Sequence, residues 1–112
     1  LCVFCIFFSC DDIVEVEDIS DDVVSILAPT DNAVLNVSTV VFTWESLEDA
    51  ESYRLQIATP NFENATQIVS DTLLSSTSYN KALEAGSYEW RIRAENSAYE
   101  TNYVINSFSV ED

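Results

Sequence analysis

Apolar and polar residues alternate in short runs from Val23 to the end of the chain, and turn-forming residues separate these runs about every ten residues. Such a pattern is typical of an all-β sandwich. No stretch keeps the 3.6-residue period of an amphipathic helix over a useful length. The pattern predicts seven strands: Val23–Ala28, Thr39–Glu45, Ser52–Thr59, Gln67–Thr72, Ser76–Asn80, Ser87–Glu95 and Asn102–Val110.

The segment Ser87–Glu95 has the clearest alternation. Successive side chains of a strand point to opposite faces, so one face should be apolar and the other charged. The apolar set is Tyr88, Trp90, Ile92 and Ala94, and the charged set is Glu89, Arg91, Arg93 and Glu95. The segments around Phe42 and Leu55 alternate in the same way. Half-buried strands of this kind predict two antiparallel sheets packed face to face about 10 Å apart.

Three segments together resemble the fibronectin type III family. They are residues 83–96, with Leu83, Gly86, Tyr88 and Trp90, then residues 41–44, ending in Trp44, and residues 50–57, with Tyr53. The resemblance covers roughly residues 24–110 and implies an immunoglobulin-like sandwich over residues 23–112.

The resemblance also implies structural roles for these residues. Trp44, Trp90, Tyr53 and Leu83 should lie in the core. The hydroxyl of Tyr88 should bond to backbone a few residues upstream, as in a tyrosine corner, with Gly86 easing the turn. The alternative is that Tyr88 is an ordinary core aromatic.

The nine residues before Cys10 are apolar apart from Ser9, and Asp11 and Asp12 follow directly. This run is too short to span a membrane, which takes about 20 residues, but it suits the apolar part of a signal peptide, about 7–15 residues. A buried strand is the alternative. The segment Phe7–Cys10 resembles the lipobox of bacterial lipoproteins. That resemblance implies that residues 1–9 are part of a signal peptide and that Cys10 is the lipidated first residue of a mature cell-envelope protein, anchored to the outer membrane.

Residues 11–22 carry seven acids and no base. A segment so acidic and free of aromatics cannot bury enough apolar surface to order itself, so we expect residues 10–22 to form a lipidated, flexible tether. Fully extended, residues 11–22 would reach about 40 Å. Acids after a lipidated cysteine also resemble export signals to the outer cell surface. The alternative is a plain solvated spacer.

The net charge of −16 makes the chain repel nucleic acid and anionic membrane surfaces. We therefore expect no nucleic-acid partner, and membrane attachment only through acyl chains on Cys10.

Candidate chemistry is sparse. The chain has no histidine, its one glycine is Gly86, and its three cysteines all lie in residues 1–10. These counts argue against histidine-dependent nucleophilic catalysis, phosphate-binding loops and zinc sites. Glu48, Asp49 and Glu51 could supply paired carboxylates, but such clusters arise by composition in so acidic a chain. We expect no enzyme, cofactor or metal.

Binding residues are expected in the loops. The loops of residues 46–51 and 96–101 should share one end of the sandwich, placing Tyr99 near Glu48, Asp49 and Glu100. An exposed tyrosine among carboxylates could stack on a sugar ring or contact a protein. The alternative is an idle loop tyrosine.

These observations predict a membrane-anchored lipoprotein with a non-catalytic binding or spacer module, and either a protein or a glycan partner. Two alternatives stay open. One is a glycan-binding accessory domain of a surface polysaccharide-uptake system. The other is the spacer domain of a truncated surface enzyme.

Overall fold

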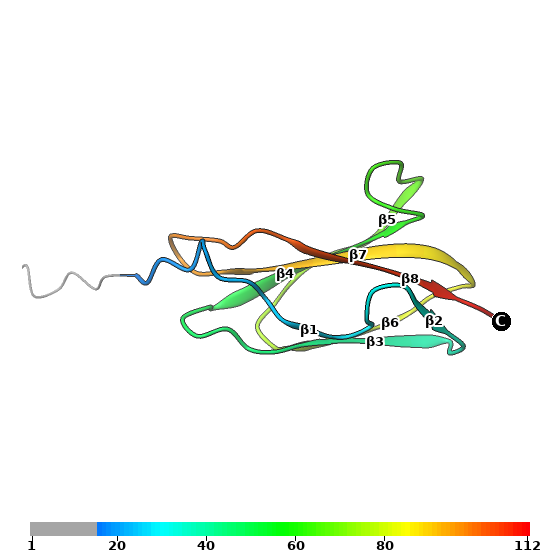
Figure 1. The fold of residues 1–112 in the computed structure, drawn as a ribbon, viewed down its shortest axis with the longest axis horizontal. Coiled ribbons are helices and arrows are strands. Elements are labelled where there is room, and N and C mark those ends of the chain that lie inside the picture. The colour runs from blue at the N-terminus through cyan, green and yellow to red at the C-terminus, as the bar shows by residue number, and fades with distance from the viewer. Residues whose placement is uncertain (1–15) are drawn as a thin grey trace, which may run out of the picture.

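The computed structural model describes residues 16–112 as two facing β-sheets (Figure 1). The three-stranded sheet has the order β1 (Ile26–Ala28), β3 (Thr39–Trp44), β6 (Ser78–Ala82). The five-stranded sheet has the order β2 (Ala33–Leu35), β8 (Val104–Val110), β7 (Gly86–Glu95), β4 (Ser52–Thr59), β5 (Gln67–Leu74). The predicted all-β, immunoglobulin-like sandwich is therefore confirmed. Among residues 16–112 there is no helix long and apolar enough to cross a membrane.

An eighth strand was missed in the sequence. β2 is three residues long and pairs in parallel with β8, with Ala33 opposite Phe108 and Leu35 opposite Val110. The turn before β2 is held by a bond from the Asn32 amide to the Ser107 carbonyl, and Asn32 has the positive φ of 67° that asparagine tolerates. Three residues are too few to show an alternation. The prediction of purely antiparallel sheets is therefore wrong at this pair.

The remaining strands lie close to their predicted positions. β4 matches its predicted bounds, and β3 ends one residue earlier than predicted. The first strand is shorter than predicted, because only Ile26–Ala28 pairs with β3. β5 and β6 both end two residues later, and β8 begins at Val104 instead of Asn102.

The core is built around aromatic side chains from both sheets. Phe42 and Trp44 of β3 face Trp90 of β7, with ring centroids 5.0 Å and 6.3 Å from that of Trp90. Tyr53 packs edge-on against Trp44 at 5.7 Å. All four are buried, which confirms the predicted core positions of Trp44, Trp90 and Tyr53.

The packed domain begins earlier in the chain than the predicted boundary at residue 23. Ile19 is completely buried and belongs to the core cluster. The carbonyl of Glu17 accepts a hydrogen bond of 2.9 Å from the Asn96 side-chain amide. The prediction that residues 17–22 belong to a free tether is therefore wrong. The acids around Ile19 stay exposed. The acidic composition of the segment as a whole did not indicate that one of its residues, Ile19, packs into the core.

The tyrosine corner is confirmed. The Tyr88 hydroxyl donates a 2.7 Å hydrogen bond to the carbonyl of Glu84, four residues upstream. The ring stacks on Phe108 at 5.4 Å, and Leu83 is also buried. Gly86 is the first residue of β7, and a Cβ built on it would meet the Tyr88 ring at 3.7 Å. Burial, assisted by the nearby charge of Glu84, raises the pKa of Tyr88 above its ordinary value.

Candidate functional site

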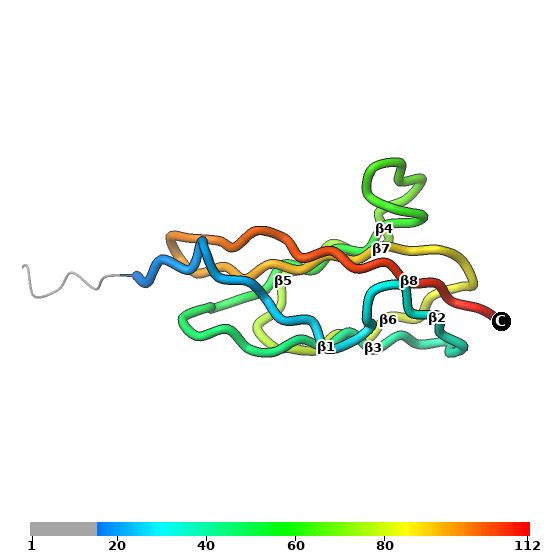
Figure 2. The backbone as a smooth tube through the Cα atoms, in the orientation of Figure 1, coloured from blue at the N-terminus to red at the C-terminus, as the bar shows by residue number. Residues whose placement is uncertain are grey.

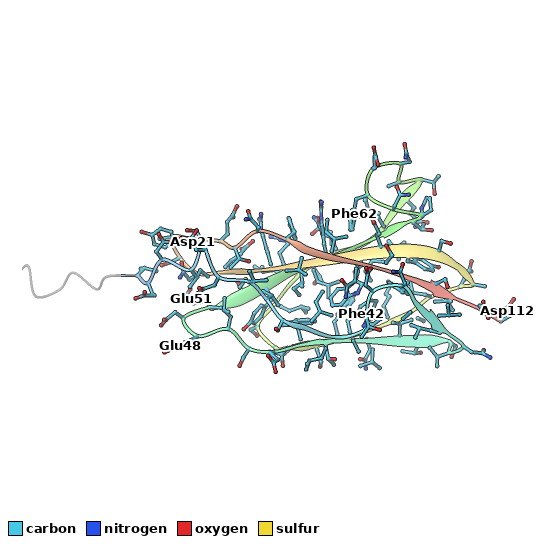
Figure 3. The ribbon with its side chains drawn as sticks, viewed as in Figure 1. Asp21, Phe42, Glu48, Glu51, Phe62 and Asp112 are labelled. Carbon is cyan, nitrogen blue, oxygen red and sulfur yellow. The ribbon has the colours of Figure 1, made fainter. Side chains whose placement is uncertain are left out.

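The two ends of the domain carry different residues (Figure 3). Glu48 and Glu51, from the β3–β4 loop, lie at the same end as Asp21, and Asp112 lies at the opposite end. We call the end formed by residues 46–51 and 96–101 the loop end. The prediction that these two loops share one end is confirmed, because the Glu51 amide bonds to the Glu95 carbonyl at 2.8 Å.

Asn96 organises the loop end. Its side-chain amide donates to the carbonyls of Glu17 and Asp49, at 2.9 Å and 3.3 Å. Its side-chain oxygen accepts bonds from the amides of Ala98 and Tyr99, at 3.0 Å and 2.8 Å. One asparagine thus joins the entering chain to both loops. Sequence reasoning missed this residue, since a single asparagine after a strand reads as an ordinary turn residue.

The four predicted binding residues are only partly brought together. Glu48 and Asp49 are exposed on one loop, and Tyr99 is 38% exposed on the other. Glu100 differs, because its carboxylate pairs with Arg93 at 3.2 Å. Asp49 adopts a φ of 68°, which gives it a turn-forming role. Ligand binding at the loop end stays a prediction. The predicted lipidation site, Cys10, lies outside the described residues.

A second surface was not predicted. It is the outer face of the five-stranded sheet, which carries three of the four basic residues of the chain: Arg54, Arg91 and Arg93. Arg54 lies directly opposite Arg93 in the β4–β7 register, a placement that would be repulsive if the charges were unpaired. Asp71 pairs with Arg54 at 3.2 Å, and Glu95 pairs with Arg93 at 2.9 Å. Acidic partners therefore offset the repulsion.

The pKa of Arg93 reflects these partners. Burial by itself lowers this pKa, but the hydrogen bond to Glu95 and the nearby charge of Glu100 outweigh burial. The pKa of Arg93 consequently lies above the ordinary value for arginine, and the side chain stays charged.

Arg91 is held in a different way from its two neighbours. Its guanidinium carbon lies 4.2 Å from the ring centroid of Phe62 and 4.4 Å from that of Tyr103. Its Nε donates a 2.7 Å hydrogen bond to the side-chain oxygen of Gln56, its cross-strand partner. Within residues 16–112 no carboxylate pairs with Arg91. Two rings and one amide thus fix the position of the guanidinium. Its terminal NH2 groups can donate hydrogen bonds to another acceptor.

A hollow of about 460 Å³ lies on the same outer face, and Arg91 lies two residues along β7 from Glu89, one of its lining residues. Its floor consists of the first residues of β7 and the last residues of β8, and its two rims are residues 32–33 and residues 60–61. Its polar lining comprises Asn32, Asn61, Ser87, Glu89, Ser107 and Ser109. The carboxylate of Glu89 accepts a 2.9 Å bond from the Phe62 amide, which ties the β4–β5 loop to the sheet.

Sequence alternation correctly predicted a charged outer face on β7. It could not indicate Phe62 and Tyr103, because these residues lie outside the strands, in loops distant in sequence from Arg91. The sequence did not indicate the hollow either, because its rims come from two loops that lie beside the sheet only in the folded domain.

Comparisons with known proteins bear on the fold. No protein-family model matches the chain, and no curated protein matches it. Among solved structures, the crystal structure of FN3tt aligns with a TM-score of 0.56 and 15% identity, over 79% of this chain and 95% of that one. A fibronectin type III domain from the human KIAA0970 protein gives a TM-score of 0.56 and 16% identity, over 78% and 72%.

A third match is an Fn3-like protein from Clostridium thermocellum, with a TM-score of 0.52 and 18% identity, over 80% of this chain and 88% of that one. Identities this low establish the fold alone. The domain therefore has a fibronectin type III-like fold, and the function must be argued from its surfaces.

Proposed function

We propose that the chain is a membrane-anchored, extracytoplasmic lipoprotein of a bacterial cell envelope, and that its fibronectin type III-like domain is a non-catalytic binding or spacer module. The apolar run that ends at Cys10 supports the anchor, and the observation that carries the spacer role is the placement of the two ends. The described chain enters the sandwich at the loop end and finishes at the opposite end (Figure 1). A module with this geometry can hold whatever lies at its far end away from an anchor.

The position of Ile19 revises the reach of the anchor. With Glu17 bonded to Asn96 and Ile19 in the core, only residues 11–16 remain between the lipidated cysteine and the domain. Six extended residues span at most about 20 Å, half of the reach expected for the whole acidic segment. The domain is consequently held close to the membrane into which the acyl chains on Cys10 insert.

This attachment orients the domain. The chain enters at the loop end (Figure 2), where Asn96 bonds to the carbonyl of Glu17, so the loop end faces the anchoring membrane. Glu89 is the β7 residue of the hollow that lies nearest to the loop end, six residues back from Glu95 and about 20 Å along the strand. A ligand or partner arriving from outside therefore meets the hollow end first.

The non-catalytic part of the proposal rests on composition. A chain with no histidine, and with all of its cysteines before residue 11, lacks the usual general base and nucleophile pairs. The acids of the β3–β4 loop are exposed and need no reaction to account for them in a chain of this charge.

Anchoring is tested by mass spectrometry of the membrane fraction of the native host. We expect a mature N-terminus at a lipid-modified Cys10 and no trace of residues 1–9. Cys10→Ala should abolish the modification, and the matched control Cys5→Ala should leave it unchanged, because Cys5 is removed with the signal peptide. An unmodified soluble chain that still carries Leu1 would contradict the proposal.

A further inference from the structure

We propose that the hollow and Arg91 together form a binding site for a carboxylated saccharide. The hydroxyl-rich part of the sugar occupies the hollow, and its carboxylate binds the guanidinium of Arg91. This inference rests on the proposed function, since it gives the binding module a site and a ligand class.

The lining of the hollow indicates hydroxyl-bearing ligands. Three serines and two asparagines are among the residues that line about 460 Å³, a volume within the range of small-molecule sites. Hydroxyls and amides both donate and accept hydrogen bonds, which matches the mixed donor and acceptor character of a sugar ring.

Arg91 supplies the group that selects an acid. A guanidinium presents its N–H donors as a planar fork that matches a carboxylate. Phe62 and Tyr103 already fix its plane, and Gln56 already occupies its Nε, so little side-chain freedom is lost on binding. Of the three arginines on the outer face, Arg91 is the one without an ion pair among the described residues.

The spacing lets one ligand reach both parts. Arg91 lies two residues beyond Glu89 on the same face of β7, about 7 Å along the strand. The exposed side chain of Ile105, directly opposite Arg91 on β8, offers an apolar contact for the C–H face of a sugar ring.

Charge favours a carboxylate over a phosphate. Glu89 faces the hollow, and Asp31 is bonded to the Ser107 amide beside it, so a dianion would meet more repulsion than a monoanion. The overall charge of −16 also repels a dianion more strongly than a monoanion. At physiological ionic strength, salt screens the charges that lie more than about 8 Å from the site, so these contribute less.

The test is calorimetric titration of the full chain, kept in a polyoxyethylene detergent that carries no sugar. The probes are trisaccharides that carry a single galacturonic, mannuronic or guluronic acid residue and two neutral sugar residues, with neutral galactotriose for comparison. We expect at least one acidic trisaccharide to bind, and the neutral one to bind at least about tenfold more weakly.

Three variants locate the site. Arg91→Gln should weaken binding at least about tenfold, because a charged hydrogen-bonding partner is lost. Lys81→Gln removes the same charge from the other sheet and should change affinity less than about twofold. Ser87→Phe places a ring in the hollow from an exposed position and should abolish binding while thermal unfolding stays unchanged.

Several results would overturn the inference. They are the absence of binding by all three acidic trisaccharides, equal losses in Arg91→Gln and Lys81→Gln, and tighter binding of an Asp- and Glu-rich peptide than of any saccharide. If one of these occurs while Cys10 is found lipidated, the ligand assignment fails and the anchored module stands.

Discussion

The two faces of β7 are organised by different contacts, the inner one by packing between the sheets and the outer one by ion pairs and aromatic rings. The inner residues Trp90 and Ile92 are completely buried, as their period-two spacing requires. The outer residues Arg91 and Arg93 share the same strand and the same spacing, yet the rings that lie against their guanidinium groups, Phe62 and Tyr103, come from loops outside it. Alternation thus determines where a side chain points, and tertiary neighbours determine what it can do there.

The largest expected effect lies on the inner face. Trp90→Ala should lower the free energy of unfolding by about 3–5 kcal/mol, because it leaves a large cavity between the sheets. Trp44→Ala should cost about the same. Urea denaturation followed by circular dichroism measures both. A loss below about 1 kcal/mol would mean that these rings do not hold the sandwich together.

A milder variant sharpens this expectation. Within residues 16–112 the indole N–H of Trp90 has no hydrogen-bond partner, and an unsatisfied buried donor costs about 1–3 kcal/mol. Trp90→Phe removes that donor together with only part of the ring volume. We therefore expect Trp90→Phe to cost much less than Trp90→Ala in the same urea series, and equal losses would contradict this account of the indole.

The next effect concerns the start of the domain. Ile19→Ala should cost about 2–5 kcal/mol, since Ile19 is completely buried. The matched control is Val23→Ala, which removes methyl groups from a side chain that is 67% exposed and should change stability by no more than about 0.5 kcal/mol. Equal losses of stability in the two variants would mean that residues 17–22 belong to the tether and not to the packed domain.

Ile19 also shows the limit of prediction from composition. Seven acids in residues 11–22 correctly indicate a segment that cannot form a core of its own. They do not indicate that one isoleucine can enter a core made by other strands. β2 was missed for a related reason, because its three residues are ordered by pairing with β8 and not by a pattern of their own.

The predicted strands depended on local alternation, whereas the tyrosine corner and the core roles of Trp44 and Trp90 were implied by the resemblance to fibronectin type III domains, and the structure confirms them. The outer-face site depended on long-range neighbours. Nothing near Arg91 in sequence points to Phe62, which follows β4, or to Tyr103, which precedes β8. Only the order of strands in the sheet brings these residues together.

A smaller effect is expected at the tyrosine corner. Tyr88→Phe should cost about 1 kcal/mol for the lost bond to the Glu84 carbonyl. Tyr99→Phe is the matched control, because it removes a hydroxyl from a partly exposed loop ring and should be near neutral. Both are measured by urea denaturation at neutral pH. A neutral Tyr88→Phe would mean that the corner bond contributes nothing.

The same tyrosine predicts a dependence on pH. The pKa of Tyr88 is raised in the folded state, so the folded chain keeps its phenol proton more tightly than the unfolded chain does. The stability linked to Tyr88 is fully present below about pH 10, the ordinary tyrosine pKa, and is lost as the pH rises above it. Wild type should therefore lose more stability than Tyr88→Phe between pH 9 and pH 11, and parallel losses would contradict the shift.

The smallest effect on stability is expected on the outer face. Arg91→Gln should cost about 0.5–1 kcal/mol, the usual contribution of a cation–π contact near the surface. Arg91→Lys keeps the charge and should cost less. A loss above about 3 kcal/mol for Arg91→Gln would make Arg91 a structural residue and remove the contrast between the two faces of β7.

The central claim is that the inner face of the five-stranded sheet maintains the fold and the outer face binds the ligand. Nuclear magnetic resonance tests it most directly, by mapping amide shifts of the full chain during titration with a trisaccharide that carries a single galacturonic acid residue. The account predicts shifts at Ser87, Glu89, Arg91, Ser107 and Ser109. Shifts confined to the loop end around Tyr99, or none at all, would contradict it.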